Sequence, residues 1–220
     1  MAAPDTNGQD GALGAADLRR AQMLDAALAI ISERGYAETR IADVADRAGV
    51  SPALVIYYYK TKDQLLTEAI RSYEDAWYAA SQSRIANLPT AMARLEEFVA
   101  MTCLAEAGQK LNGSRQLWLE FWTRAARNEA VARVREASDR RWRDAIASLV
   151  RVGQRAGEFG DVDVDVGSFA IHLSALLDGL TVQLALGDPG IDGQRAFELT
   201  MRFIAGQLGF SWNPGRTVDA

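Results

Sequence analysis

The sequence predicts an all-α protein in which a small N-terminal three-helix unit and a larger helical domain share one continuous helix. Apolar residues recur at spacings of three and four along most of the 220 residues, which is the period of an amphipathic helix. Ser, Thr, Asp or Asn precedes most of these segments and Gly follows several, as at helix ends. Residues 161–166, DVDVDV, alternate with the period of a strand. No other segment offers a partner strand, so we expect a loop there.

The composition is that of a globular protein, with 49% hydrophobic and 24% charged residues. Residues 1–17 are rich in Gly, Ala and polar side chains, which predicts a disordered leader rather than a signal peptide. No apolar run approaches the roughly 20 residues that span a bilayer. With Cys103 as the one cysteine, no intrachain disulfide can form, as is usual in a reducing compartment. We therefore expect a cytoplasmic protein without a membrane partner.

The N-terminal unit begins with a helix from about Asp17 to Arg34. Residues 39–62 then predict two short helices around a tight turn. Thr39 is expected to cap the first and Ser51 the second, with a glycine in the turn and Pro52 at the first helical position. These proportions are those of a helix-turn-helix, whose second helix enters the major groove of DNA. The same pattern of caps also occurs in ordinary helical hairpins.

Positive charge is concentrated in and around the predicted helix-turn-helix. The net charge of −5 argues against a nucleic-acid partner, but residues 34–62 carry more basic than acidic side chains. A small basic surface on an acidic body suits a site-specific DNA-binding protein. The basic residues of this stretch are Arg34, Arg40, Arg47, Lys60 and Lys62.

Two parts of the chain resemble known regulators. Residues 18–68, with LRRAQMLDAALAIISERGY, TRIADVADRAGVS and YYYKTKDQLL in order, resemble the DNA-binding domain of the tetracycline-repressor (TetR) family. Residues 112–208, with WLEFW, Arg140-Arg141 and ALLDGL, resemble the C-terminal domain of its choline-responsive branch. The resemblance implies an N-terminal three-helix helix-turn-helix DNA-binding domain over 18–60. A continuous helix joins it to a C-terminal helical ligand-binding and dimerisation domain over 61–208, followed by a tail over 209–220.

The expected DNA-binding residues lie on and around the second short helix. Val55 and Tyr59 should face the protein core. The family often carries Thr where Leu54 stands and Tyr where Ile56 stands, and no Arg, Asn or Gln lies on this helix. We therefore expect contacts with thymine methyl groups rather than bidentate hydrogen bonds. The candidate DNA contacts are Thr39, Arg40, Ser51, Pro52, Ala53, Leu54, Ile56, Tyr57, Tyr58 and Lys62.

Six further helices are expected, at about 62–84, 90–107, 115–127, 128–156, 166–186 and 193–208. Their aromatic residues have two interpretations, a helical core or the wall of a ligand cavity. Tryptophan faces can hold a quaternary ammonium group, but core packing explains the same residues, so the effector is not identified. The candidate pocket residues are Trp77, Tyr78, Trp118, Phe121, Trp122 and Trp142.

The helix at 166–186 is apolar nearly all round, and such a helix must be covered on both sides. A second subunit is the simplest cover, in a four-helix contact around a two-fold axis. The candidate interface residues are Phe169, Leu173, Leu176, Leu180, Leu184, Phe197, Met201, Ile204 and Leu208.

Catalysis is not expected. The single histidine, His172, has no acid or nucleophile on its helical face, and one Cys with one His cannot form a zinc cluster. No metal or cofactor is predicted. The sequence predicts a homodimeric repressor that a small-molecule effector releases from a palindromic operator. The alternative is a small-molecule-binding or interaction module without sequence-specific DNA binding.

Overall fold

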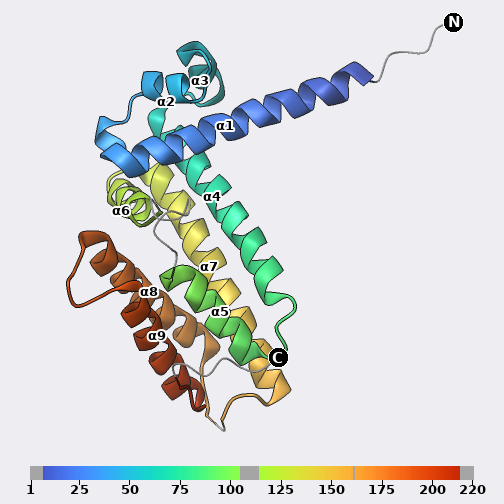
Figure 1. Cartoon of the computed structure of the whole chain (residues 1–220), viewed down its shortest axis with the longest axis vertical. Coiled ribbons are helices and arrows are strands. Elements are labelled where there is room, and N and C mark those ends of the chain that lie inside the picture. The colour runs from blue at the N-terminus through green and yellow to red at the C-terminus, as the bar shows by residue number, and fades with distance from the viewer. Residues whose placement is uncertain (1–6, 105–113, 161, 214–220) are drawn as a thin grey trace, which may run out of the picture.

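The computed structural model describes residues 7–104, 114–160 and 162–213, and every regular element in those residues is an α-helix (Figure 1). The all-α prediction is confirmed, and residues 162–165 are irregular, as expected for the DVDVDV loop. The helices are α1 (Asn7–Glu38), α2 (Ile41–Arg47), α3 (Pro52–Tyr58), α4 (Lys62–Ile85), α5 (Ala91–Cys103), α6 (Ser114–Ala125), α7 (Glu129–Ala156), α8 (Val166–Leu186) and α9 (Gly193–Leu208).

Helix α1 begins at Asn7, ten residues before the expected start at Asp17. Residues 7–17 contain three alanines but also three glycines, so intrinsic helix propensity does not explain the early start. The segment expected as a leader over 1–17 is thus helical from Asn7, and residues 1–6 lie outside the described part. Near its end the helix is interrupted at Gly35, whose φ of +81° favours glycine.

The N-terminal unit packs around the middle of α1. Met23, Ala27 and Ile30 lie against Val44 of α2 and Val55 of α3, all of them buried. This small core fixes α2 and α3 as a rigid pair on one side of α1 (Figure 1).

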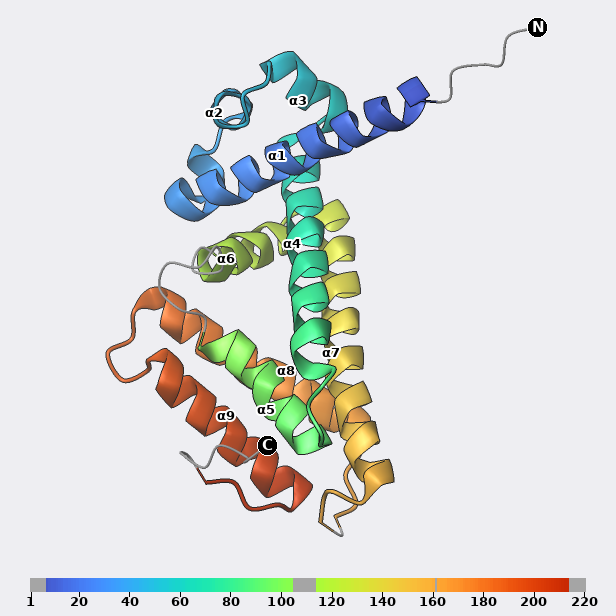
Figure 2. The ribbon, with the colours of Figure 1, turned by 45° about the vertical axis from the view of Figure 1, so that its right-hand side comes forward.

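Helix α4 runs without interruption from the N-terminal unit into the larger domain (Figure 2). Its first turns contribute Leu65 and Ala69 to the core around α1, and its later turns place Trp77 and Ile85 against the core of the C-terminal domain. The two parts of the protein are therefore connected by a continuous helix, so a shift of α4 moves the helix-turn-helix with it.

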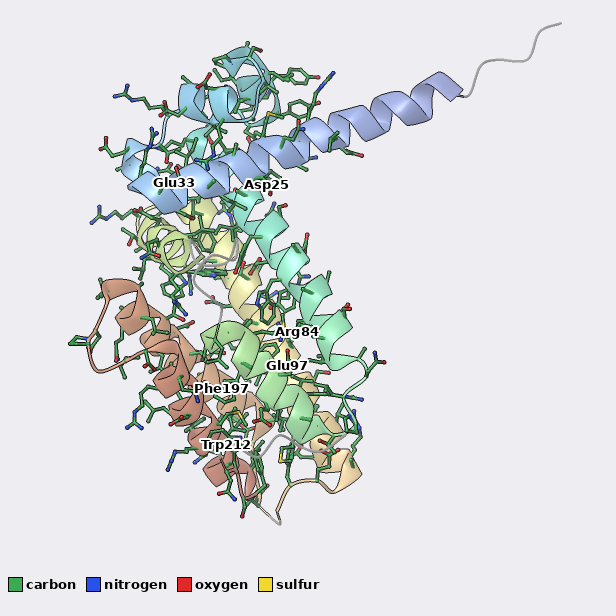
Figure 3. The ribbon with its side chains drawn as sticks, viewed as in Figure 1. Asp25, Glu33, Arg84, Glu97, Phe197 and Trp212 are labelled. Atoms are coloured by element: carbon green, nitrogen blue, oxygen red, sulfur yellow. The ribbon has the colours of Figure 1, made fainter. Side chains whose placement is uncertain are left out.

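The C-terminal domain is built from α5 and α7 to α9, whose buried side chains form one core. A partly solvent-exposed ion pair of 2.5 Å joins Arg84 of α4 to Glu97 of α5 (Figure 3). The start of the expected tail also belongs to this domain, because Trp212 packs edge-on against Phe197 and its Nε1 donates to Glu96. Residues 214–220 lie outside the described part.

The candidate interface residues are mostly not available to a second subunit. Phe169, Leu173, Leu180, Phe197, Met201, Ile204 and Leu208 are buried in the core of their own chain, and Leu176 and Leu184 pack against it half-buried. This part of the prediction is wrong. The periodicity identified the apolar stripes, but the two helices turn them toward α5, α7 and each other.

Helix α8 is the one described helix that is long and apolar enough to cross a membrane by length and composition. A core helix of a soluble protein meets the same criterion. Here α8 packs against α6, α7 and α9, which accounts for its buried side. Elsewhere along the helix Ile171 and Leu186 stay exposed.

Candidate functional site

Helix α3 is held so that one side faces solvent. The Ser51 hydroxyl oxygen accepts from the Leu54 backbone N–H at 3.2 Å, which caps the helix as predicted. Val55 and Tyr59 are 0% and 1% exposed, so their predicted core positions are confirmed.

Most of the candidate DNA contacts on this helix lie on its outer side. Pro52, Ala53, Ile56 and Tyr57 are exposed, together with the capping Ser51, whereas Leu54 and Tyr58 are half-buried. Arg40, just before α2, is also exposed.

Two of the candidate phosphate contacts serve the protein instead. Thr39 is 2% exposed, and its hydroxyl donates to the Gly35 carbonyl at 2.8 Å rather than capping α2. The Lys62 ammonium group donates to the carbonyls of Ala37 and Thr39 at 3.1 and 2.8 Å. It also lies 4.3 Å from the centre of the Tyr36 ring. Both side chains therefore fix the connection between α1 and α2. The buried Thr39 side chain is not available to a phosphate, whereas a phosphate contact by the half-buried Lys62 stays a prediction.

A cavity of about 290 Å³ lies in the C-terminal domain between α4, α5, α6, α7 and α8. Five of the six candidate pocket residues line it: Trp77, Tyr78, Trp118, Trp122 and Trp142. Trp77 and Trp142 are neighbours, with ring centres 5.1 Å apart, and the rings of Trp118 and Trp122 are 6.0 Å apart. Aromatic faces from three helices thus form much of the wall.

Phe121, the sixth candidate, does not line the cavity. It is 0% exposed and packs with Ile31 of α1, Leu66 and Ile70 of α4 and Val131 of α7. Helix α6 therefore has two different faces. One presents Trp118 and Trp122 to the cavity, and the other closes the core between the two domains.

Three carboxyl groups also line the cavity, and sequence reasoning missed them. Glu74 of α4 is buried and accepts from the Ser138 hydroxyl at 2.9 Å, and burial raises the pKa of its carboxyl. Asp139 of α7 pairs with Arg135 and Arg143. Burial raises the pKa of Asp139 as well.

Asp178 of α8 differs from the other two acids. It has no hydrogen-bond or ion-pair partner in the described part of the chain, although it lines the cavity. Partial desolvation by the surrounding protein raises the pKa of its carboxyl to about 6, and the Asp139 charge adds to the effect, although the residue stays in contact with solvent. Asp178 is the one Asp, Glu, Lys or Arg in the 21 residues of α8. An isolated charge in an apolar helix was the sequence signal that could have found it.

A cluster of hydrogen bonds on Asp63 joins the cavity wall to the DNA-binding unit. Arg124, at the end of α6, donates from Nε and Nη2 to the two carboxylate oxygens at 2.7 and 2.6 Å. The Asn128 amide donates at 2.8 Å, and the Tyr36 hydroxyl of α1 donates to the same carboxylate. Arg124 and these other donors hold the pKa of Asp63 below its ordinary value. Asp63 lies in the first turn of α4, so α1, α4, α6 and the start of α7 meet at one residue.

No group of three or more His, Cys, Asp or Glu side chains suited to a metal ion occurs in the described residues. The described geometry offers a short helix, α3, with one exposed side and an aromatic cavity, linked through α4 and α6.

Comparison with known proteins agrees with this arrangement. Residues 23–69 match the family model of bacterial regulatory proteins of the tetR family, and residues 91–209 match the model of the BetI-type transcriptional repressor C-terminal domain. The regulator BetI of Escherichia coli K12 is 31% identical over 201 residues, covering 89% of this chain and 97% of that protein. BetI of Burkholderia ambifaria MC40-6 is 31% identical over 194 residues, covering 87% and 95%.

Comparison with solved structures also finds transcriptional regulators. A transcriptional regulator from Saccharomonospora viridis, in complex with choline, superimposes with a TM-score of 0.76 at 29% identity, covering 84% of this chain and 94% of that one. A TetR-family regulator from a Rhodococcus species gives a TM-score of 0.77 at 24% identity, covering 87% and 99%.

A helix-turn-helix joined by one continuous helix to a cavity-bearing domain defines a ligand-responsive DNA-binding transcriptional regulator. The relatives compared above are regulators rather than enzymes. The chain belongs to the TetR family and carries the BetI-type C-terminal domain of its repressors.

Proposed function

We propose that the protein is a homodimeric cytoplasmic repressor that leaves a palindromic operator when a quaternary ammonium cation, with choline as the first candidate, enters the cavity. Residues 18–60 bind the operator, and residues 61–208 bind the cation and dimerise. The proposal is supported by the choline complex of the S. viridis relative and by the chemistry of the cavity in this chain.

The observation that carries the proposal is an aromatic cavity with one unpaired carboxylate. Quaternary ammonium groups bind to aromatic faces through cation–π attraction, most strongly to tryptophan. Of the two arginines on the cavity, Arg143 pairs with Asp139, and Arg115 donates to the Cys103 carbonyl at 3.2 Å. Asp178 therefore supplies negative charge that a cation can balance.

In this proposal, α6 transmits ligand binding to the DNA-binding unit, because the same helix lines the cavity and contacts the start of α4. A ligand that shifts Trp118 and Trp122 moves the same helix that holds Asp63 through Arg124. A dimer of this class reads half-sites roughly 34–36 Å apart, so displacement of α4 takes one recognition helix out of register. The cation must bind the released form of the dimer more tightly than the DNA-bound form, because equal affinities shift no equilibrium.

Choline is expected to bind the protein at least about tenfold more tightly than 3,3-dimethylbutan-1-ol, its uncharged isostere, because only the cation gains from the aromatic faces and the carboxylate. Isothermal titration of both compounds measures this difference. Fluorescence anisotropy of a labelled operator should show that choline, and not the isostere, releases the DNA. Equal binding of the two compounds, or no choline binding at millimolar concentration, contradicts the proposed effector class.

The choline affinity is expected to fall as pH falls through about 6, because protonation of Asp178 removes the charge that attracts the cation. Asp178→Asn should lower the affinity at pH 8 by roughly fivefold, a modest loss because the pair is partly solvated. The variant should also show a flatter pH profile between pH 5 and 8. An unchanged profile in Asp178→Asn assigns the pH dependence to another group.

The exposed sides of α8 and α9 are the surface proposed for dimerisation. They carry small and apolar residues beside the buried stripes: the exposed Gly179 and the half-buried Val182 on α8, with the half-buried Leu199 and Phe203 and the exposed Gly206 on α9. A two-fold axis would pair this surface with itself and cover the outer side of α8.

Gly179→Arg is expected to convert the dimer into folded single chains that no longer bind the operator. A Cβ at Gly179 meets nothing within 4 Å in its own chain, so the large side chain conflicts only with a partner. Sedimentation velocity and circular dichroism measure assembly and fold. Gly179→Ala serves as the control and should remain dimeric. Leu180→Asp, in contrast, should unfold the domain, because Leu180 is buried in its own chain. A Gly179→Arg protein that sediments like the wild type contradicts the surface.

A further inference from the structure

The outer side of α3 is apolar where a recognition helix usually carries hydrogen-bonding side chains. Ile56 and Tyr57 are 51% and 68% exposed, the largest apolar surfaces on this helix, and Ala53 is exposed one turn before Tyr57. Val55 and Tyr59 anchor the opposite side in the core, which leaves the helix no freedom to rotate.

The polar groups around α3 are largely committed to the protein itself. The Lys60 ammonium group donates to the Tyr57 carbonyl at 2.7 Å and lies 5.1 Å from the centre of that ring. Arg47 pairs with Glu33 at 2.7 Å. Lys62 is held by the carbonyls at the end of α1.

Arg40 is the exception among the basic residues adjacent to α2 and α3. It is exposed, and within the described residues no carboxylate pairs with its guanidinium group. A free arginine at the edge of the helix-turn-helix suits a DNA phosphate, which positions the protein without giving base information.

The base-facing groups that α3 offers besides the Tyr57 and Tyr58 hydroxyls are apolar. Guanine and adenine are normally recognised by bidentate contacts from Arg, Lys, Asn or Gln, none of which lies between Pro52 and Tyr58. Thymine alone presents a methyl group in the major groove, and apolar side chains recognise it by contact. We infer that Ile56, with Ala53 beside it, determines the operator sequence by contact with thymine methyl groups, while Arg40 supplies sequence-independent anchoring.

The test uses a footprinted operator in which each half-site thymine is replaced, one position at a time, by deoxyuridine. This change removes only the methyl group and leaves base pairing intact. At the contacted thymine the wild-type Kd should rise about fourfold for one half-site, and about fifteenfold when both half-sites are changed. Fluorescence anisotropy at fixed salt measures the Kd, and uracil outside the half-sites provides the DNA control.

The matched protein variant is Ile56→Ala, at an exposed position where alanine maintains the helix. It should bind the unmodified operator more weakly and should lose the uracil penalty, because the methyl contact is already absent. Its affinity for unrelated DNA should not change. Arg40→Ala should weaken all DNA sequences alike, reduce the slope of log Kd against log salt by about two (about one for each subunit of the dimer), and keep the full uracil penalty.

Two results would overturn the inference. The first is undiminished wild-type affinity at every uracil-substituted position, which assigns recognition to DNA shape or to another residue. The second is a uracil penalty in Ile56→Ala equal to that of the wild type, which removes Ile56 from the contact.

Discussion

Phe121→Ala is expected to lower the free energy of unfolding by about 3–5 kcal/mol, the range for removal of a fully buried phenylalanine. The ring is 0% exposed and lies between α1, α4 and α7. Its loss leaves a cavity where the DNA-binding unit meets the C-terminal domain, so operator binding should fall with stability. Urea denaturation followed by circular dichroism measures the change.

The neighbouring residue provides the control. Trp122 lines the aromatic cavity from the other face of α6 and is half-buried. Trp122→Ala should therefore cost less stability than Phe121→Ala and preserve operator binding, but it should weaken the response to the effector. A Phe121→Ala protein that loses less than about 1 kcal/mol contradicts the packing described for this position.

Asp63→Asn is expected to lower the free energy of unfolding by about 1–2 kcal/mol at pH 7, because the neutral amide replaces a carboxylate that accepts from three residues. The expected loss of stability is moderate because 21% of the Asp63 side chain and 36% of the Arg124 side chain are exposed, so solvent screens their charges. The effector should also release this variant less effectively from the operator, because Arg124 of α6 loses its carboxylate partner on α4.

The acid dependence of this effect has a defined sign. The pKa of Asp63 is lowered from its ordinary value of 3.8, mainly by Arg124. Its stabilising contribution is therefore complete above about pH 4 and is lost as the pH falls through the lower folded-state pKa. The stability difference between wild type and Asp63→Asn should be constant from pH 7 to about 5 and should shrink below pH 4. Urea midpoints across this range measure it.

Asp75→Asn is the matched control, because it removes the same charge from the same helix. Asp75 pairs with Arg141 at 2.6 Å, but 69% and 44% of these side chains are exposed. An exposed ion pair contributes little to the free energy of unfolding, so this variant should stay near wild-type stability over the whole pH range. Equal losses in the two variants would show that net charge, rather than the Asp63 cluster, is responsible.

The sequence by itself determined the local structure. Ser51, Asn128 and Asp165 begin their helices because each cap depends on a side chain and backbone groups within three residues. The positions of Val55 and Tyr59 in the core followed from helical periodicity for the same reason. The family resemblance added the order of the domains and the DNA-binding function, which the comparisons support.

Only the tertiary structure decided which side of each apolar helix faces which partner. Helix α8 is apolar nearly all round, so its period of 3.6 residues could not separate the stripe buried in its own chain from the outer side that carries Gly179. Likewise, Phe121 and Trp122 are adjacent aromatic residues, yet one closes the interdomain core and the other lines the cavity.

The polar partners were also beyond reach of the sequence, because they are far apart along the chain. Asp63 and Arg124 are separated by 61 residues, and Lys62 is held by carbonyl groups 23 and 25 residues before it. The carboxyl groups of Glu74, Asp139 and Asp178 come together from three helices. Such contacts depend on how the helices pack, since side-chain chemistry specifies what can be bound but only the packed fold brings the groups within bonding distance.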